Sequence, residues 1–89
     1  MEIIKSTNQN GVSKINETLK IKYSLVVKDE NVKSFTGQII KDDNIVGFCN
    51  ANANGVVGFS LNEEHGLTNE EFTATIQQFA SDTTNVFGG

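Results

Sequence analysis

Cys49 and His65 have the clearest capacity for catalytic chemistry, since each is the only residue of its type in the chain. A thiol and an imidazole within hydrogen-bond reach can form a nucleophile pair. The predicted elements separate them, because Cys49 falls in a strand and faces away from the predicted helix, whereas His65 falls in the loop before that helix. We therefore expect Cys49 to have only a structural role as a small strand residue. The alternative function is that of a small enzyme that uses Cys49.

The carboxylates occur as sequence neighbours, which does not favour a shared site. Glu63, Glu64 and His65 are consecutive, and successive side chains diverge, so they cannot surround one metal ion without further ligands. The other acidic pairs stand in predicted turns or at the helix start, where solvated turn chemistry explains them: Asp29-Glu30, Asp42-Asp43 and Glu70-Glu71. No glycine-rich run opens the helix to hold a phosphate. The sequence therefore predicts no catalytic residue, no metal and no cofactor.

Alternation of apolar and polar residues predicts strands through the first two thirds of the chain. The clearest strand runs from residue 17 to residue 28, and its apolar set is Leu19, Ile21, Tyr23, Leu25 and Val27. Turn signals at Asp29-Glu30-Asn31, Asp43-Asn44 and Asn54-Gly55 then separate predicted strands over residues 32–41, 45–53 and 56–61. At the N-terminus, Ile3 and Ile4 indicate either a further short strand, with Asn10-Gly11 as its turn, or an irregular segment.

Turn lengths of three, two and two residues set a strand register that keeps the apolar residues on one face. The predicted partners are Leu25 with Phe35, Tyr23 with Gly37, Ile21 with Ile39, Ile39 with Phe48, and Phe48 with Leu61. The ring of Tyr23 is expected to fill the gap that Gly37 leaves in the neighbouring strand. Tyr23, Phe35, Phe48 and Phe59 should therefore share one side of the sheet.

A helix is predicted after residue 67 by two independent start signals. Thr68 and Glu71 have the spacing of a capping box, and Leu67 and Phe72 occupy the positions of a hydrophobic staple. The apolar positions that follow have helical spacing: Phe72, Ile76, Phe79, Ala80 and Thr83. We expect this stripe to cover the apolar side of the sheet, with Phe72 and Phe79 buried against Phe35, Phe48 and Phe59.

The predicted fold class is therefore α+β. It is an antiparallel β-meander of four to five strands with one C-terminal amphipathic helix packed on one sheet face. A chain of 89 residues is too short for two hydrophobic cores, so residues 1–89 are expected to form a single domain.

The composition argues against several classes of partner. The formal net charge is −4, and all basic residues are lysines, so nucleic-acid binding is not expected. The chain has no apolar stretch long enough for a membrane span or a signal peptide, and its single cysteine fits a reducing compartment. These features predict a cytoplasmic protein without a membrane partner. The richness in asparagine and lysine suits a product of an AT-rich bacterium or of its mobile elements.

The sheet face without a helix is the predicted functional surface. On the predicted register its last two strands carry small residues, which leave the surface nearly flat. The candidate interface comprises Lys20, Lys22, Lys28, Thr36, Gln38, Gly47, Cys49, Ala51, Gly58 and Ser60. We expect a non-enzymatic interaction or accessory protein that docks a protein partner, or a second copy as a homodimer, on this face. The competing interpretation is a plain solvated face.

The terminal Gly88-Gly89 pair supports a further alternative function. A diglycine end resembles those of ubiquitin-like proteins and of the double-glycine leaders of exported peptides, which implies processing or conjugation at the C-terminus. Asp82 and Val86 fit the spacing of a leader, but Thr83 stands where a leucine is expected. Ubiquitin-like folds place their helix between strands, whereas here the helix comes last. The other interpretation of the glycine pair is structural: one of the two glycines ends the helix in the left-handed backbone conformation.

Overall fold

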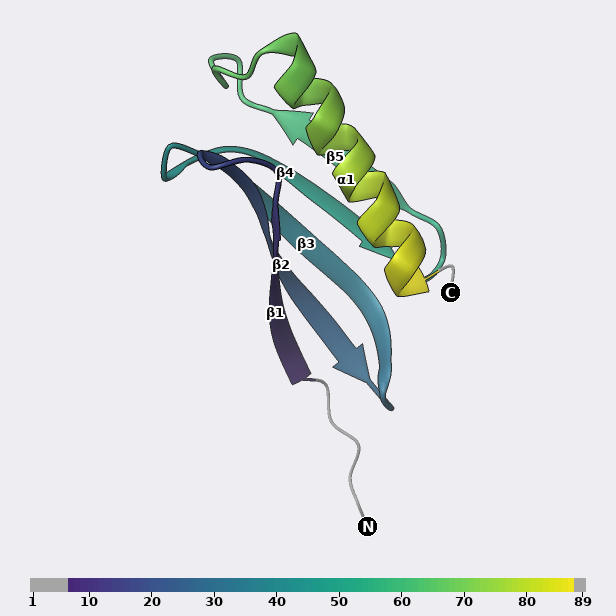
Figure 1. Cartoon of the computed structure of the whole chain (residues 1–89). Helices are drawn as coiled ribbons and strands as arrows, with labels where there is room; N and C mark the ends of the chain where they lie inside the picture. Colours follow the sequence, from purple (N-terminus) through teal and green to yellow (C-terminus); the bar gives the residue numbers. More distant parts are fainter. Residues whose placement is uncertain (1–6, 88–89) are drawn as a thin grey trace.

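The protein is described by a computed structural model that covers residues 7–87. Its strands are β1 (Thr7–Lys14), β2 (Leu19–Lys28), β3 (Asn31–Lys41), β4 (Asn44–Asn52) and β5 (Val57–Leu61), and its helix is α1 (Asn69–Phe87). The strands form one antiparallel sheet in the order β1-β2-β3-β4-β5 (Figure 1). The predicted α+β meander with a C-terminal helix is confirmed.

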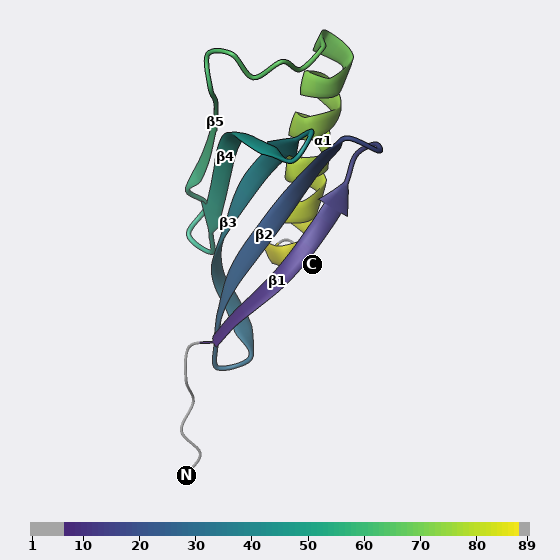
Figure 2. The same cartoon turned by 90° about the vertical axis from the view of Figure 1, so that its left-hand side faces the viewer.

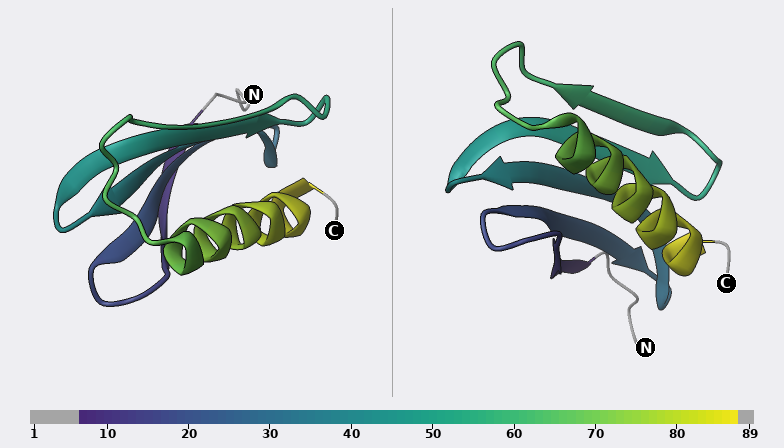
Figure 3. Two further views of the ribbon diagram at one scale, coloured as in Figure 1. Left: turned by 90° about the horizontal axis from the view of Figure 1, so that it is seen from above. Right: turned by 45° about the horizontal axis from the view of Figure 1, so that its top comes forward.

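The molecule has two layers, because α1 lies along one side of a curved sheet (Figure 3). In Figure 2, α1 lies behind the sheet, and no element of residues 7–87 covers the side nearer the viewer. The hydrophobic core sits between the layers and consists of Leu19, Ile21, Tyr23, Phe35, Ile39, Val46, Cys49, Ala51 and Phe79. The ring of Phe79 lies 6.0 Å from that of Phe35 and 5.9 Å from that of Phe59, which joins the helix to the sheet.

The helix begins at the predicted capping box. The Thr68 N–H donates to Glu71 Oε1, and the Glu71 N–H donates to Thr68 Oγ1, each at 3.1 Å. Glu71 also accepts a hydrogen bond from Lys41 Nζ at 2.7 Å, so the same side chain caps α1 and ties it to β3. One turn later the buried Thr75 donates to the Glu71 carbonyl at 2.7 Å, which satisfies its hydroxyl inside the core.

The turn of the N-terminal hairpin lies between β1 and β2, after Asn10-Gly11, so the turn predicted at Asn10-Gly11 is wrong. Both residues lie within β1, where Gly11 pairs with Tyr23. The actual turn precedes β2, and Asn16 Oδ1 accepts the Thr18 N–H at 2.9 Å. The Asn16 side chain stabilises the turn here, and this outweighs the turn propensity of Asn10-Gly11. The predicted strand at Ile3 and Ile4 lies outside the described residues.

The pairing of β2 with β3 agrees with the predicted register, although it arises differently. Leu25 faces Phe35, Tyr23 faces Gly37 and Ile21 faces Ile39, as predicted. The turn contains Asp29 and Glu30, both with positive φ, and a bulge between Val26 and Val27 absorbs the extra residue. A two-residue turn with a bulge therefore has the same effect on the register as the expected three-residue turn.

The predicted pairing of β3 with β4 is wrong by one residue. Asp42 and Asp43 form the turn with φ values of 51° and 67°, and Ile40 pairs with Ile45. A bulge then follows, so Ile39 pairs with Gly47 instead of Phe48. Because side chains alternate along a strand, the shift turns β4 over. Cys49 and Ala51 are buried on the helix side, and Phe48 is 45% exposed on the opposite side.

The predicted pairing of Phe48 with Leu61 is also wrong, because Leu61 pairs with Gly47 and Phe59 pairs with Cys49. Asn54-Gly55 lies inside a longer connection, in which Asn52 Oδ1 accepts the N–H groups of residues 54 and 56 at 2.9 and 3.2 Å. The two register errors cancel in β5. Phe59 and Leu61 therefore pack against the core on the predicted side.

The helix is rotated relative to the predicted contact face. Thr75 and Phe79 are its buried residues, whereas Phe72 and Ile76 are 39% and 38% exposed. Phe72 contacts the ring of Phe59 edge-on at 6.4 Å, but it lies at the rim of the core. Burial of Phe79 is therefore confirmed, and full burial of Phe72 against the sheet is wrong.

An alanine at residue 37 should destabilise the fold, because its Cβ would lie 2.6 Å from Cys49 Sγ and 2.9 Å from Ile21 Cγ2. We expect Gly37→Ala to lower the free energy of unfolding by about 1–3 kcal/mol, as overpacking does. Urea denaturation measures the change. Gly11→Ala is the matched control, because Gly11 also pairs with Tyr23 and a Cβ there meets nothing within 4 Å. Equal losses in the two variants would contradict this packing.

Acid should weaken the attachment of α1 to β3. The hydrogen bond from Lys41, together with those from Thr68 and Asn16, lowers the Glu71 pKa from its ordinary 4.5 to about 2. A carboxylate with a lowered pKa in the folded state stabilises the fold above its unfolded pKa, and this contribution disappears as the pH falls from 4.5 to about 2.

Thermal melts between neutral pH and pH 2 should therefore show a smaller loss of Tm for Glu71→Gln than for the wild type. The amide keeps an acceptor for Thr68 but removes the charge next to Lys41. Glu70→Gln is the control, because Glu70 is exposed in the same helical turn. If the two variants have the same acid profile, Glu71 does not carry the effect.

Candidate functional site

The helix-free side of the sheet, hereafter the open face, is the candidate site. Residues that alternate with the buried core positions point to it. One row crosses all five strands through successive pairs, Val12 with Lys22, Lys22 with Gln38, Gln38 with Phe48, and Phe48 with Ser60. A second set beside this row consists of Lys14, Lys20, Thr36, Asn50 and Gly58.

Most of the predicted interface residues lie on the open face. The structure brings together Lys20, Lys22, Thr36, Gln38, Gly58 and Ser60, and Lys28 is exposed at the end of β2. The assignments of Gly47, Cys49 and Ala51 to this face are wrong, because all three are buried toward α1. The bulge at the start of β4 is the physical reason, since it shifts the register by one residue.

Phe48 is the functional candidate that sequence reasoning missed. It occupies the open face between Gln38 and Ser60, where small residues were predicted. The Asp42-Asp43 pair indicates where the turn lies, because aspartate tolerates the left-handed backbone of a tight hairpin turn. That signal moves the turn one residue earlier and the register by two residues, which alone would leave Phe48 opposite Gly37 on the helix side. Only the bulge after the turn places Phe48 on the open face, and no residue pattern in the sequence indicates that bulge.

Charge is segregated between the strands and the rest of the molecule. Every lysine among residues 7–87 lies in a strand, and every aspartate and glutamate in this range lies in a turn, a loop or α1. Lys14 and Lys20 are direct cross-strand partners, and Lys22 follows on the same face. Within the described residues, the one ion pair joins Lys41 to Glu71. The open face therefore has a positive corner at β1 and β2.

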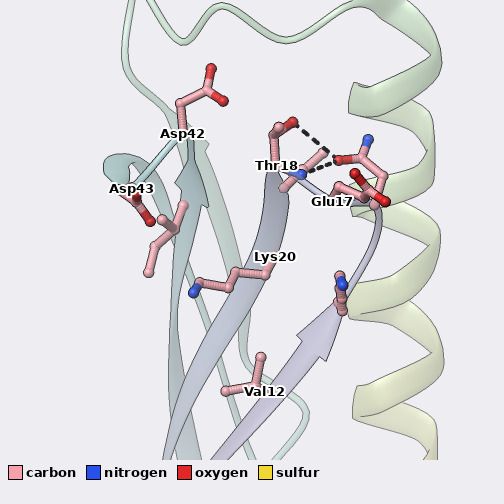
Figure 4. Close-up of a pocket in the computed structure, with 10 residues that line it drawn as sticks. Val12, Glu17, Thr18, Lys20, Asp42 and Asp43 are labelled. Carbon is pink, nitrogen blue, oxygen red and sulfur yellow. Dashed lines mark hydrogen bonds between the residues drawn. The ribbon is translucent and has the colours of Figure 1, made fainter.

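A hollow of about 420 Å³ lies beside this corner (Figure 4). Figure 4 shows Lys20 and Val12 between the Asp42-Asp43 turn and the loop that holds Glu17. The lining therefore combines charges of both signs, and its carboxylates border the lysines. This arrangement is typical of a notch in a larger polar surface, because a dedicated anion site would gather donors of one sign.

Cys49 is packed as a core residue. Its side chain is fully buried, and its sulfur lies over Gly37, where a side chain would collide with it. Burial raises the pKa of the thiol to about 12, so the sulfur is protonated at neutral pH. His65 Nδ1 accepts the Leu67 N–H at 2.9 Å, which uses the imidazole to order the loop before α1. The geometry thus gives both residues structural roles.

No group of three or more metal-ligating side chains converges within the described part of the chain. The carboxylate of Asp82 on α1 has three side-chain hydrogen-bond partners. Its Oδ2 accepts hydrogen bonds from Ser13 Oγ and Tyr23 Oη, both at 2.7 Å, and its Oδ1 accepts one from Gln78 Nε2 at 2.9 Å. Burial and this contact raise the pKa of Tyr23. Asp82 therefore anchors α1 to β1 and β2.

Comparison of the chain with protein-family models, curated proteins and solved structures gave no match. The only helix among residues 7–87 is too polar to span a membrane. Gly88 and Gly89, which carry the diglycine hypothesis, lie outside the described residues.

Cys49 should react slowly with thiol reagents. We expect an aromatic disulfide reagent at neutral pH to modify Cys49 more slowly than free cysteine, because the sulfur is buried and protonated. The absorbance of the released thiolate measures the rate. The same reaction in urea is the control, since unfolding should restore ordinary reactivity. A native rate above that of free cysteine would contradict the core assignment and revive the hypothesis of a Cys49 enzyme.

Proposed function

We propose that this chain is a non-enzymatic interaction protein that docks an acidic surface of a partner protein on its open face. The observation that carries the proposal is the segregation of charge. Lys14, Lys20 and Lys22 form the positive corner, and no strand among the described residues contributes a carboxylate. An acidic surface would therefore meet the sheet more favourably than any other part of the molecule.

The middle of the open face supplies the apolar contact that such an interface requires. Phe48 stands among polar neighbours, with Gln38 and Ser60 directly beside it and Asn50 on the same strand. Aromatic side chains surrounded by a polar rim are enriched in protein interfaces, where they carry much of the binding energy. Phe48 would be the anchor, and the lysines would set orientation and association rate.

The class of partner follows from the amount of charge. Nucleic-acid binding requires a continuous excess of basic residues, whereas this chain has a net charge of −4 and its positive corner is bordered by acidic turns. A protein surface with a few carboxylates matches the small size of the corner. As part of the proposal we place the protein in the cytoplasm, where a reducing environment keeps Cys49 as a thiol.

The proposal is tested by capturing partners from a lysate of the source organism on immobilised protein. We expect a specific partner to be retained at low salt, released at high salt, and lost with Phe48→Ala and with the Lys20→Glu, Lys22→Glu double variant. Each change should weaken binding at least about tenfold, as loss of an anchor or of charge complementarity does.

Lys33→Glu is the matched control, because Lys33 is exposed at the other end of β3. It changes the net charge by the same amount per residue but leaves the positive corner intact. Retention of the same partner by all variants, or equal loss with Lys33→Glu, would overturn the assignment of the open face.

A further inference from the structure

A second surface, separate from the open face, lies where α1 meets β5. A groove of about 400 Å³ runs along this seam, lined by Val57, Phe59, Ile76, Phe79, Ala80 and Thr83. None of these side chains carries a charge. The seam is on the helix side of the sheet, so binding there does not compete with binding on the open face.

The groove exists because the sheet covers only part of the apolar stripe of α1. Thr75 and Phe79 are buried, whereas Phe72 and Ile76 on the side toward β5 are more than one third exposed. Val57 on the edge strand is 56% exposed beside them. Ordinary protein surfaces carry isolated apolar residues. A contiguous apolar surface of this kind is instead typical of an interaction site.

The strand at this seam has a free edge. β5 is the last strand of the sheet, and within residues 7–87 only β4 pairs with it. Its sequence, Val-Gly-Phe-Ser-Leu, contains none of the lysines or prolines that guard exposed edges. The opposite edge differs, because β1 carries Lys14. An added strand would therefore find backbone partners and no repulsive charge at β5.

We infer that a second copy of this chain occupies the seam, with β5 pairing antiparallel to β5 and α1 lying beside α1 around a twofold axis. A twofold axis through Phe59 would place Val57 opposite Leu61 of the second copy. Apolar side chains would then face each other on the helix side of the joined sheet. Gly58 would face Ser60 of the second copy, which joins small residues on the open side. The seam is thus complementary to itself.

Charge permits a second copy at this place, and the match of the seam to itself favours that occupant over an unrelated partner. Outside the groove lining, the loops and the first turn of α1 are acidic, and two copies repel wherever their carboxylates approach each other. The seam is the neutral surface where this repulsion is smallest. The contact comprises one short strand edge and one helix row, which is small for an interface, so we expect a dissociation constant of roughly 1–100 μM.

Sedimentation velocity over a series of protein concentrations tests the inference. The wild type should pass from monomer to dimer as the concentration rises, and Ile76→Glu should remain monomeric, because it places like charges opposite each other across the axis. Val57→Lys is a second variant, which guards the edge without altering the helix. Circular dichroism and thermal melts establish that each variant is folded.

Val12→Glu is the matched control, because Val12 is exposed on the open face at the far side of the sheet. It should dimerise like the wild type. A wild type that stays monomeric up to millimolar concentration would overturn the inference, as would a dimer that persists in Val57→Lys and Ile76→Glu. Salt distinguishes the two surfaces, since seam dimerisation should not weaken with salt, whereas docking of an acidic partner on the open face should.

Discussion

The close approach of three side chains at one glycine determines how the two layers meet. Gly37 has no Cβ, and the space it leaves is filled by the Cys49 sulfur, an Ile21 methyl group and the edge of the Tyr23 ring. The hydroxyl of that ring then reaches Asp82 on α1. The absence of a side chain at Gly37 therefore lets these three side chains pack close to the sheet, and it places the Tyr23 hydroxyl within reach of α1. It also requires β4 to turn Cys49 inward, which leaves Phe48 outside.

Two surfaces of different character follow from this packing. The open face is polar, carries Lys14, Lys20 and Lys22, and exposes the ring of Phe48. The seam between β5 and α1 is apolar and uncharged. They lie on opposite sides of a single sheet, so the two proposed interactions would not exclude each other. A dimer through the seam would continue the open face across a larger sheet and repeat its positive corner at both ends.

The sequence was sufficient for features that depend on local pattern. The alternation in β2, the capping box of Thr68 and Glu71 and the pairing of Tyr23 with Gly37 all follow from spacing and residue type. The orientation of β4 did not, because apolar residues occur on both of its faces and a bulge absorbs one residue after the turn. The helix rotation was not predicted because threonine is a polar residue, yet the Thr75 hydroxyl is satisfied inside the core by donating to the Glu71 carbonyl one turn earlier. The candidate residues on β2, β3 and β5 therefore lie on the open face as predicted, whereas those on β4 lie on the helix side.

Confinement of the lysines to the strands makes the charge distribution of the molecule uneven despite its modest net charge. A body of this kind does not behave as a uniform anion. In an external field it turns its sheet toward negative charge before any contact is made, so its approach to a polyanionic surface is oriented.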